Sequence, residues 1–414
     1  MNRLLIQNIS QIATPIGNKA IHGTAMDNIK IYNDAAIYCE NDIIRKVGST
    51  AEVLASVGSC SDINVIDASG KCVVPGFTDP HTHFLFGGTR ADEFISRLEG
   101  VPYLDLLRQG GGIVNTMQKT RAMSCDELYN AGKKTLQNMI KQGFTTIEGK
   151  SGYGLDFTTE INMLKTMKKL HDNLPVSLKT TFLGAHAVPP EYKNDSDGFI
   201  DFTIKKVLPE VAKENLADFC DIFCEQGVFS IAQSEKLLLA AQKLGLKSKI
   251  HADEIVSTGG GGLAAKINAT SADHLLAVSA SDINKLANSK TIAVLLPLTA
   301  FCMRKDFAPA RKMIDKNCAI ALASDFNPGS CYSYSSALIL ALAVINMHMT
   351  INEALTAITL NAAAAIDEAA ICGSIEAGKK ADILILEKPD YRFLVYHTGI
   401  NIIEHVIKDG QLLF

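Results

Sequence analysis

The chain has 414 residues, with 40 basic and 44 acidic side chains and a formal net charge of −4. Hydrophobic residues make up 47% of it and charged residues 20%, a composition typical of folded globular proteins rather than of disordered ones. The near balance of charge argues against nucleic acid or an anionic membrane surface as a partner, and no run of 18 apolar residues predicts a membrane span.

The first 75 residues predict strands joined by turns. Residues 1–7 contain an apolar run too short for a signal peptide, and we expect a first strand there. Residues 35–38 and 43–44 flank the polar pair Asn41-Asp42, a pattern typical of a β-hairpin. This end of the chain therefore predicts a β-rich unit.

The middle of the chain predicts strands and helices in alternation. Apolar residues at helical spacing occur at 128–140, 161–170 and 237–244. Short apolar runs typical of buried parallel strands are expected at 72–78, 144–149, 178–183, 219–224, 248–252, 272–276, 292–296 and 320–324. Eight such units predict an α/β fold, a (β/α)8 or TIM barrel, with a doubly wound open sheet as the alternative.

The last 40 residues are similar in pattern to the first 75. Strands are expected at 381–386, 393–396 and 405–412, where Asp409-Gly410 is a hairpin signal. Two strand-rich ends around an alternating middle predict a small β-sandwich-like domain formed by both chain termini. We expect residues 1–75 and 370–414 in that domain, and residues 76–369 in the barrel.

The ten cysteines include no Cys-x-x-Cys pair. A chain of this size without a secretion signal does not need disulfides, so we expect reduced cysteines in a cytoplasmic protein. Cys220 and Cys224 lie close together in sequence, and we interpret them as core residues of a strand in preference to a zinc site.

Polar residues gather where the predicted barrel strands end, which is where a (β/α)8 barrel carries its reactive groups. Five of the ten histidines lie at these ends. The segments are residues 79–83, 148–154, 184–186, 251–254, 273–274 and 324–330. This placement favours the barrel over the open sheet and predicts one site at that end.

His81 and His83 are two residues apart on a predicted extended segment, so both imidazoles point the same way and can reach one cation. Such a pair alone is a weak signal. His251 and Asp325, at the ends of the fifth and eighth strands, add a nitrogen and a carboxylate that suit a divalent zinc or iron ion. The alternative is a group of hydrogen-bonded core histidines with a capping aspartate.

Several segments carry a resemblance to known sequences. Residues 74–83, Val-Pro-Gly-Phe-Thr-Asp-Pro-His-Thr-His, resemble the opening motif of the amidohydrolase superfamily of metal-dependent hydrolases, and residues 373–382 resemble its C-terminal return to the small domain. Residues 148–154, 182–186, 251–254 and 324–330 make the chain similar, along essentially its whole length, to the imidazolonepropionase family. Ser330 is a small departure, because that family often has Thr there.

The resemblance implies an enzyme of histidine degradation that hydrolyses the cyclic amide of 4-imidazolone-5-propanoate to N-formimidoyl-L-glutamate, commonly as a homodimer. It also implies a metal held by His81, His83, His251 and Asp325. Relatives with a second metal hold it through a lysine on the fourth strand. That strand ends here in Cys224-Glu225-Gln226, so we expect one divalent ion, zinc or iron, per subunit.

The resemblance also suggests roles around the metal. We expect Glu254 to carry a proton to the leaving nitrogen, His274 to hydrogen-bond the developing oxyanion, and Asp325 to accept the first proton. Arg90 could hold the propanoate bidentately. The expected substrate contacts are Arg90, Tyr153, His186, Glu254, Asn327, Gly329 and Ser330, with Tyr103 as a further candidate. The alternatives are a solvated loop carboxylate, a core histidine, a surface arginine and an ordinary Pro-Gly turn.

Two glycine clusters, 110–112 and 259–262, lack the Lys-Ser/Thr ending of a nucleotide-binding loop, and we interpret them as flexible active-site loops. Two other functions stay open. An aminohydrolase that releases ammonia from a purine, pyrimidine or triazine would share the metal ligands and Glu254, but it has less reason for Arg90 and the 327–330 turn. A non-catalytic barrel scaffold would be expected to lose metal ligands.

Overall fold

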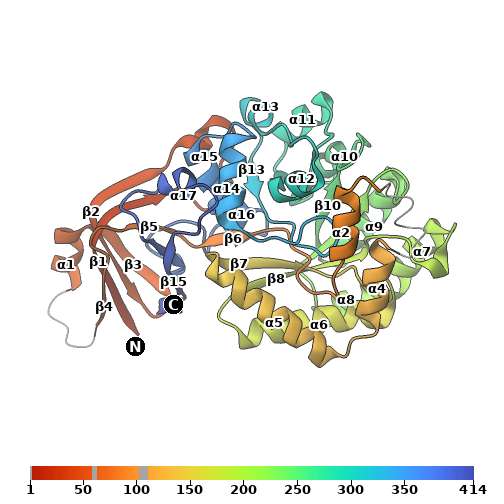
Figure 1. Cartoon of the computed structure of the whole chain (residues 1–414), viewed down its shortest axis with the longest axis horizontal. Helices are drawn as coiled ribbons and strands as arrows, with labels where there is room; N and C mark the ends of the chain where they lie inside the picture. Colours follow the sequence, from red (N-terminus) through yellow and green to blue (C-terminus); the bar gives the residue numbers. More distant parts are fainter. Residues whose placement is uncertain (1, 58–62, 102–110) are drawn as a thin grey trace.

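In the computed structural model, which describes residues 2–57, 63–101 and 111–414, a parallel barrel lies beside a smaller domain built on a mixed sheet (Figure 1). The barrel strands follow one another in chain order around the sheet, from β6 to β13, which confirms the predicted TIM barrel. They are β6 (Phe77–Asp79), β7 (Phe144–Lys150), β8 (Ser177–Ala185), β9 (Phe219–Cys224), β10 (Lys247–Ala252), β11 (Ser271–His274), β12 (Ile292–Leu295) and β13 (Ile320–Leu322).

The barrel closes just past the ends of β6 and β13. Thr82 and Phe326 form a parallel bridge there. The Asp325 amide donates to the His81 carbonyl at 3.0 Å, and the His83 amide donates to the Phe326 carbonyl at 2.9 Å. The closure therefore brings the two predicted histidine ligands on one segment beside the predicted aspartate ligand on the other.

Helices cover the outside of the barrel (Figure 1), and most of them bury apolar side chains against it. Serine caps fix where two of them begin: Ser124 and Ser230 accept from the backbone N–H three residues on and complete capping boxes. The helices between barrel strands include α2 (Ala91–Leu98), α4 (Ile113–Arg121), α5 (Cys125–Lys141), α6 (Phe157–Asn173), α7 (Ser196–Phe202), α8 (Leu208–Lys213), α9 (Ile231–Lys243), α10 (Gly260–Lys266), α11 (Ala280–Ala287), α12 (Pro297–Met303) and α13 (Ala310–Asp315). After β13 come α14 (Ser336–Ile345), α15 (Ile351–Ile358) and α16 (Leu360–Ala364).

The apolar run predicted as one strand at 72–78 is two strands in different sheets. β5 (Cys72–Pro75) pairs with strands of the small domain, and β6 begins the barrel. Gly76 separates them, and a Cβ there would lie 2.3 Å from Thr145 Oγ1, so the close approach requires glycine. The single-strand prediction is wrong because one uninterrupted apolar sequence serves two cores.

The small domain joins both ends of the chain in one sheet, in the order β16-β15-β14-β5-β1-β2-β3, with β4 beside β1. Asn41 and Asp409-Gly410 adopt positive φ and form the two predicted hairpin turns. The further strands are β1 (Arg3–Thr14), β2 (Lys30–Glu40), β3 (Ile43–Ser49), β4 (Asn64–Asp67), β14 (Ile383–Leu386), β15 (Ile403–Lys408) and β16 (Gln411–Leu412). A helix, α1 (Thr50–Val57), follows β3.

One predicted strand of the C-terminal region is wrong. Residues 393–396 form a short helix, α17 (Phe393–Tyr396), which packs against α14 and buries Leu394. Packing against the barrel overrides the strand preference of its aromatic and branched residues.

The nine described cysteines are free thiols, and Cys220 and Cys224 are buried in β9 as core residues. Across the same described ranges, no helix is long and apolar enough to cross a membrane.

Candidate active site

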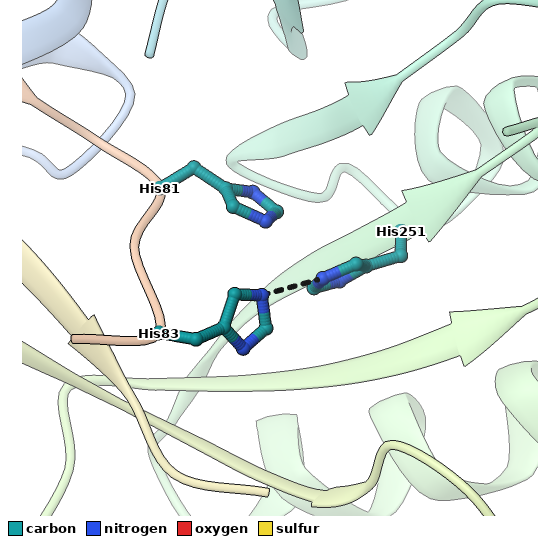
Figure 2. Close-up of side chains that lie close together, drawn as sticks. All are labelled: His81, His83 and His251. Carbon is teal, nitrogen blue, oxygen red and sulfur yellow. Dashed lines mark hydrogen bonds between the residues drawn. The ribbon is translucent and has the colours of Figure 1, made fainter. Parts of the chain in front are cut away.

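The four predicted metal ligands meet at the mouth of the barrel. The Nε2 atoms of His83 and His251 face each other at 3.3 Å, and the His81 ring lies beside them (Figure 2). Asp325 Oδ1 lies 3.5 Å from His81 Nε2 and 3.6 Å from His83 Nε2. All four side chains are buried, so three ring nitrogens and one carboxylate oxygen converge in a space shielded from bulk water.

This donor set fits a divalent metal ion. Two imidazole nitrogens facing each other at 3.3 Å need a proton or a metal ion between them. His81 Nε2 is buried and has no hydrogen-bond partner among the described residues. Burial, with neighbouring positive charges, holds the pKa values of His81 and His83 well below the usual range, and neutral imidazole is the form that binds metal.

His274 belongs to the same cluster. Its ligand nitrogen, a His81 nitrogen and an Asp325 oxygen all lie within 4.8 Å of one another, so His274 is also within reach of an ion that these residues hold. Its Nε2 lies 3.8 Å from Glu254 Oε2. The sequence interpretation gave His274 an oxyanion role and did not consider it as a ligand.

Two carboxylates that had no role in the sequence interpretation face the predicted ligands. Asp273 Oδ2 lies 2.6 Å from His81 Nδ1, and Asp221 Oδ2 lies 2.9 Å from His251 Nδ1. Thr299 donates to Asp325 Oδ2 at 2.6 Å. An acceptor at Nδ1 favours the tautomer that turns a bare Nε2 toward the metal. The signal available for Asp221 was a single charge inside the apolar run of β9.

Glu254 lies at the edge of the site with its side chain 19% exposed. Burial raises its pKa to about 8, and the nearby Asp325 and Glu225 carboxylates add to the effect. In the metal-free chain it therefore holds a proton at neutral pH. Its carboxylate faces His274, and the proton-carrying role expected of it stays a prediction.

The glycine cluster at 259–262 holds this edge in place and is not the flexible loop we expected. It forms the start of α10, and Gly260, Gly261 and Gly262 are buried. Asp253, next to Glu254, accepts from the amides of Thr258, Gly259 and Gly261 at 2.7–3.0 Å. A Cβ at Gly262 would lie 2.3 Å from Asp282 Oδ1, so tight packing explains the glycine.

Tyr153 and His186 form one wall of the site. The His186 ring stacks on His83 with centroids 4.9 Å apart, and Tyr153 lies 5.2 Å from His186. Glu160 of α6 fixes the loop that carries Tyr153, accepting from the amides of Gly152, Gly154 and Leu155. Both predicted contact residues therefore lie beside the histidine cluster.

Arg90 is not a surface arginine. Its side chain is 11% exposed, and Nε and Nη2 each lie 2.9 Å from Glu93 Oε2. A Cβ on Gly329 would lie 2.3 Å from Nη1, so the guanidinium lies directly against that glycine. One edge of the guanidinium is thus held by Glu93, and Nη1 lies on the side that faces Gly329.

The turn at 327–330 uses most of its own donors. Asn327 Oδ1 accepts from the Gly329 and Ser330 amides at 2.8 and 2.7 Å, and its Nδ2 donates to the Asp325 carbonyl and Ser330 Oγ. The backbone amides of Gly329 and Ser330, two of the expected substrate contacts, are therefore engaged inside the turn. The Ser330 hydroxyl hydrogen is not used by it. Tyr103 lies outside the described residues.

Comparison with known proteins agrees with this geometry. The model of the amidohydrolase family matches residues 72–413. The chain is 51% identical to an imidazolonepropionase of Clostridium tetani, over 99% of this chain and 98% of that protein. It is 49% identical to one of Parabacteroides distasonis, over 99% of each.

Solved structures share the fold at low identity. An adenosine deaminase from Xanthomonas campestris with bound zinc has a TM-score of 0.68 at 17% identity, covering 99% of this chain and 92% of that one. An atrazine chlorohydrolase from Arthrobacter aurescens complexed with zinc has a TM-score of 0.70 at 14% identity, covering 99% and 95%.

Proposed function

The chain belongs to the imidazolonepropionases of the amidohydrolase family, and from that premise we propose that it hydrolyses the cyclic amide of 4-imidazolone-5-propanoate to N-formimidoyl-L-glutamate. The observation that carries the proposal is full-length similarity at 51% identity to a protein of that name. The cluster of His81, His83, His251 and Asp325 supplies the donor set that such a hydrolase needs.

We propose that these four residues hold one divalent ion, zinc or iron, in each subunit. When bound, the ion supplies the Lewis acidity that makes a water molecule nucleophilic at neutral pH. Asp221 and Asp273 fix the ring orientation of His251 and His81 for that purpose. Because the Thr299 hydroxyl donates to Asp325 Oδ2, the other oxygen, Oδ1, faces the histidines.

In the proposed reaction two residues transfer protons and a third stabilises the oxyanion. Asp325 accepts the first proton from the attacking water, and Glu254 delivers a proton to the ring nitrogen as the amide bond breaks. His274, 3.8 Å from Glu254, hydrogen-bonds the developing oxyanion. The raised pKa of Glu254 suits a group that must donate near neutral pH.

The substrate tail is assigned to Arg90. Glu93 holds the Nε and Nη2 edge of the guanidinium in place, and Nη1, which lies against Gly329, donates to the propanoate carboxylate. Tyr153 and His186 then contact the ring, and the Ser330 hydroxyl contributes a hydrogen bond to the tail. Asn327 and Gly329 shape the turn.

We also propose that the protein is cytoplasmic and forms a homodimer. We expect it to bind its small-molecule substrate and neither nucleic acid nor a membrane. The free thiols of the nine described cysteines support a reducing compartment. Sedimentation velocity tests the homodimer, since a single species with the mass of one chain would contradict it.

The deciding experiment compares two reactions. Loss of imidazolonepropanoate is followed by ultraviolet absorbance, beside ammonia release from purine, pyrimidine and triazine substrates. Turnover only in the first assay is expected. Turnover only in the second would favour the aminohydrolase, and metal-loaded protein inactive in both would favour a scaffold. The deaminase and chlorohydrolase structures support the shared fold, and their identity is too low to favour their reactions.

A further inference from the structure

Five charged side chains with no exposed surface lie within the barrel, beneath the histidine cluster. They come from the barrel strands β7, β9, β10 and β11, and they carry three negative and two positive charges. They are Glu148, Lys150, Asp221, Lys249 and Asp273. Buried charges are costly unless each is closely paired, so this group calls for a reason beyond packing.

Two members of the group touch the proposed metal ligands. Asp273 and Asp221 face the Nδ1 atoms of His81 and His251, at 2.6 and 2.9 Å. Each carboxylate also has other donors available. Ser271 donates to Asp273 Oδ1 at 2.5 Å, and the Ile222 and His251 amides donate to Asp221 Oδ1.

Lys150 joins these two carboxylates. Its Nζ lies 2.9 Å from Asp221 Oδ2 and 3.6 Å from Asp273 Oδ2, which are the same oxygens that face the histidines. Glu148 Oε1, at 2.9 Å, completes its surroundings. Without this shared ammonium, two like charges would face each other in a buried space and move apart.

Lys249 is placed differently, although it is equally buried. Its Nζ donates to the carbonyls of Pro80 and Ala365 at 3.1 and 3.2 Å. It lies 3.7 Å from Glu148 and 3.9 Å from Asp273. Of the two lysines, only Lys150 is within hydrogen-bond distance of a carboxylate that holds a histidine.

We propose that Lys150 is a positioning residue for the metal site: its ammonium holds Asp221 and Asp273 together as acceptors, and through them fixes the Nε2 atoms of His251 and His81 toward the ion. The inference rests on the metal ligands proposed above. It predicts that the charge of Lys150 sets metal affinity, although Lys150 does not contact the ion.

Lys150→Met tests this, because it keeps the length of the side chain and removes the ammonium. Lys408→Met is the matched control. Lys408 is 2% exposed and lies 3.0 Å from a buried carboxylate, Asp382, but it belongs to β15 in the small domain. Loss of a buried ion pair should lower the thermal stability of both variants, so stability alone does not separate the two roles.

Metal affinity distinguishes a role in positioning the metal ligands from a role in stability alone. The dissociation constant is measured by competition with a chelator on purified folded protein, and the ligand geometry by the visible spectrum of the cobalt-substituted form. For Lys150→Met we expect affinity about 10- to 100-fold weaker, the usual effect of losing a residue that orients a metal ligand, and an altered cobalt spectrum. For Lys408→Met we expect both to match the unaltered chain.

Unchanged affinity and spectrum in Lys150→Met, with only stability lowered, would overturn the proposal. If that variant does not fold, Lys150→Gln keeps N–H donors without the charge, and the same comparison applies. Failure of the proposed metal site is distinguishable, because the unaltered chain would then bind no stoichiometric metal. That result would overturn both proposals.

Discussion

Arg90→Lys tests how the substrate tail is bound. The structure places the Nε and Nη2 edge of Arg90 on Glu93, and the Nη1 side against Gly329. A lysine ammonium cannot serve Glu93 and a substrate carboxylate with the same fixed geometry. The variant should lose one charge-assisted hydrogen bond, worth about 1.5–3 kcal/mol. At about 1.4 kcal/mol per decade, KM should rise roughly 10- to 150-fold with a smaller change in kcat.

The assay is steady-state ultraviolet loss of imidazolonepropanoate over a range of substrate concentrations. Arg392→Lys is the control, because Arg392 also pairs with a carboxylate, that of Asp390, but lies ahead of α17 outside the barrel mouth. Its KM should not change. A second perturbation leaves Arg90 itself unaltered: Gly329→Ala would push a methyl group into Nη1 and should also raise KM. Unchanged KM in both Arg90→Lys and Gly329→Ala would refute the assignment of the tail to Arg90.

Three further results are expected. Glu254→Gln should lower kcat by about 10²–10⁴-fold with KM and metal content little changed, and retention of more than about a third of kcat would move the proton to another residue, with His274 tested next. His83→Ala should reduce bound metal from one ion per chain to none by elemental analysis with the circular dichroism preserved, so a retained ion would contradict the ligand set. In the metal-free chain, burial raises the pKa of Glu254 from its ordinary value of 4.5 to about 8. The protonated side chain therefore contributes fully to the free energy of unfolding below about pH 4.5, and this contribution is lost as the pH rises toward 8. The unfolding free energy of the unaltered chain, measured by urea titration, should therefore fall across that interval relative to that of Glu254→Gln. Plots of unfolding free energy against pH that run parallel for the two proteins would exclude the effect.

The features that sequence predicted are those carried by short segments. The barrel followed from eight apolar runs, and the metal cluster from histidines placed where those runs end. Closure of β6 against β13 then brought His83 and Asp325 together, as a barrel requires. Hairpin turns at Asn41 and Asp409 were also readable, because their backbone conformation is a local property.

The features that sequence missed depend on pairing between distant strands. Asp221 is an isolated charge in an apolar strand and Asp273 one polar residue at a strand end, and only the barrel shows that each faces a histidine from another strand. The apolar run at 72–78 gave no sign that Gly76 divides it between two sheets. The glycines at 259–262 begin a helix whose first amides donate to Asp253, and that contact depends on a chain reversal that composition does not reveal.

The sheet shared by the two chain ends has a consequence during protein synthesis. β5 is complete at Pro75, yet its partner β14 begins only at Ile383. At 5–20 residues per second, roughly 15–60 s of translation separate the two, and throughout that time one edge of β5 has no strand beside it. The core formed by the apolar side chains of β1 and β2 is also incomplete until Ile383, Ile385 and Ile407 have been synthesised. The nascent N-terminal strands are therefore an aggregation hazard that ends when the last 32 residues leave the ribosome and cover the open edge.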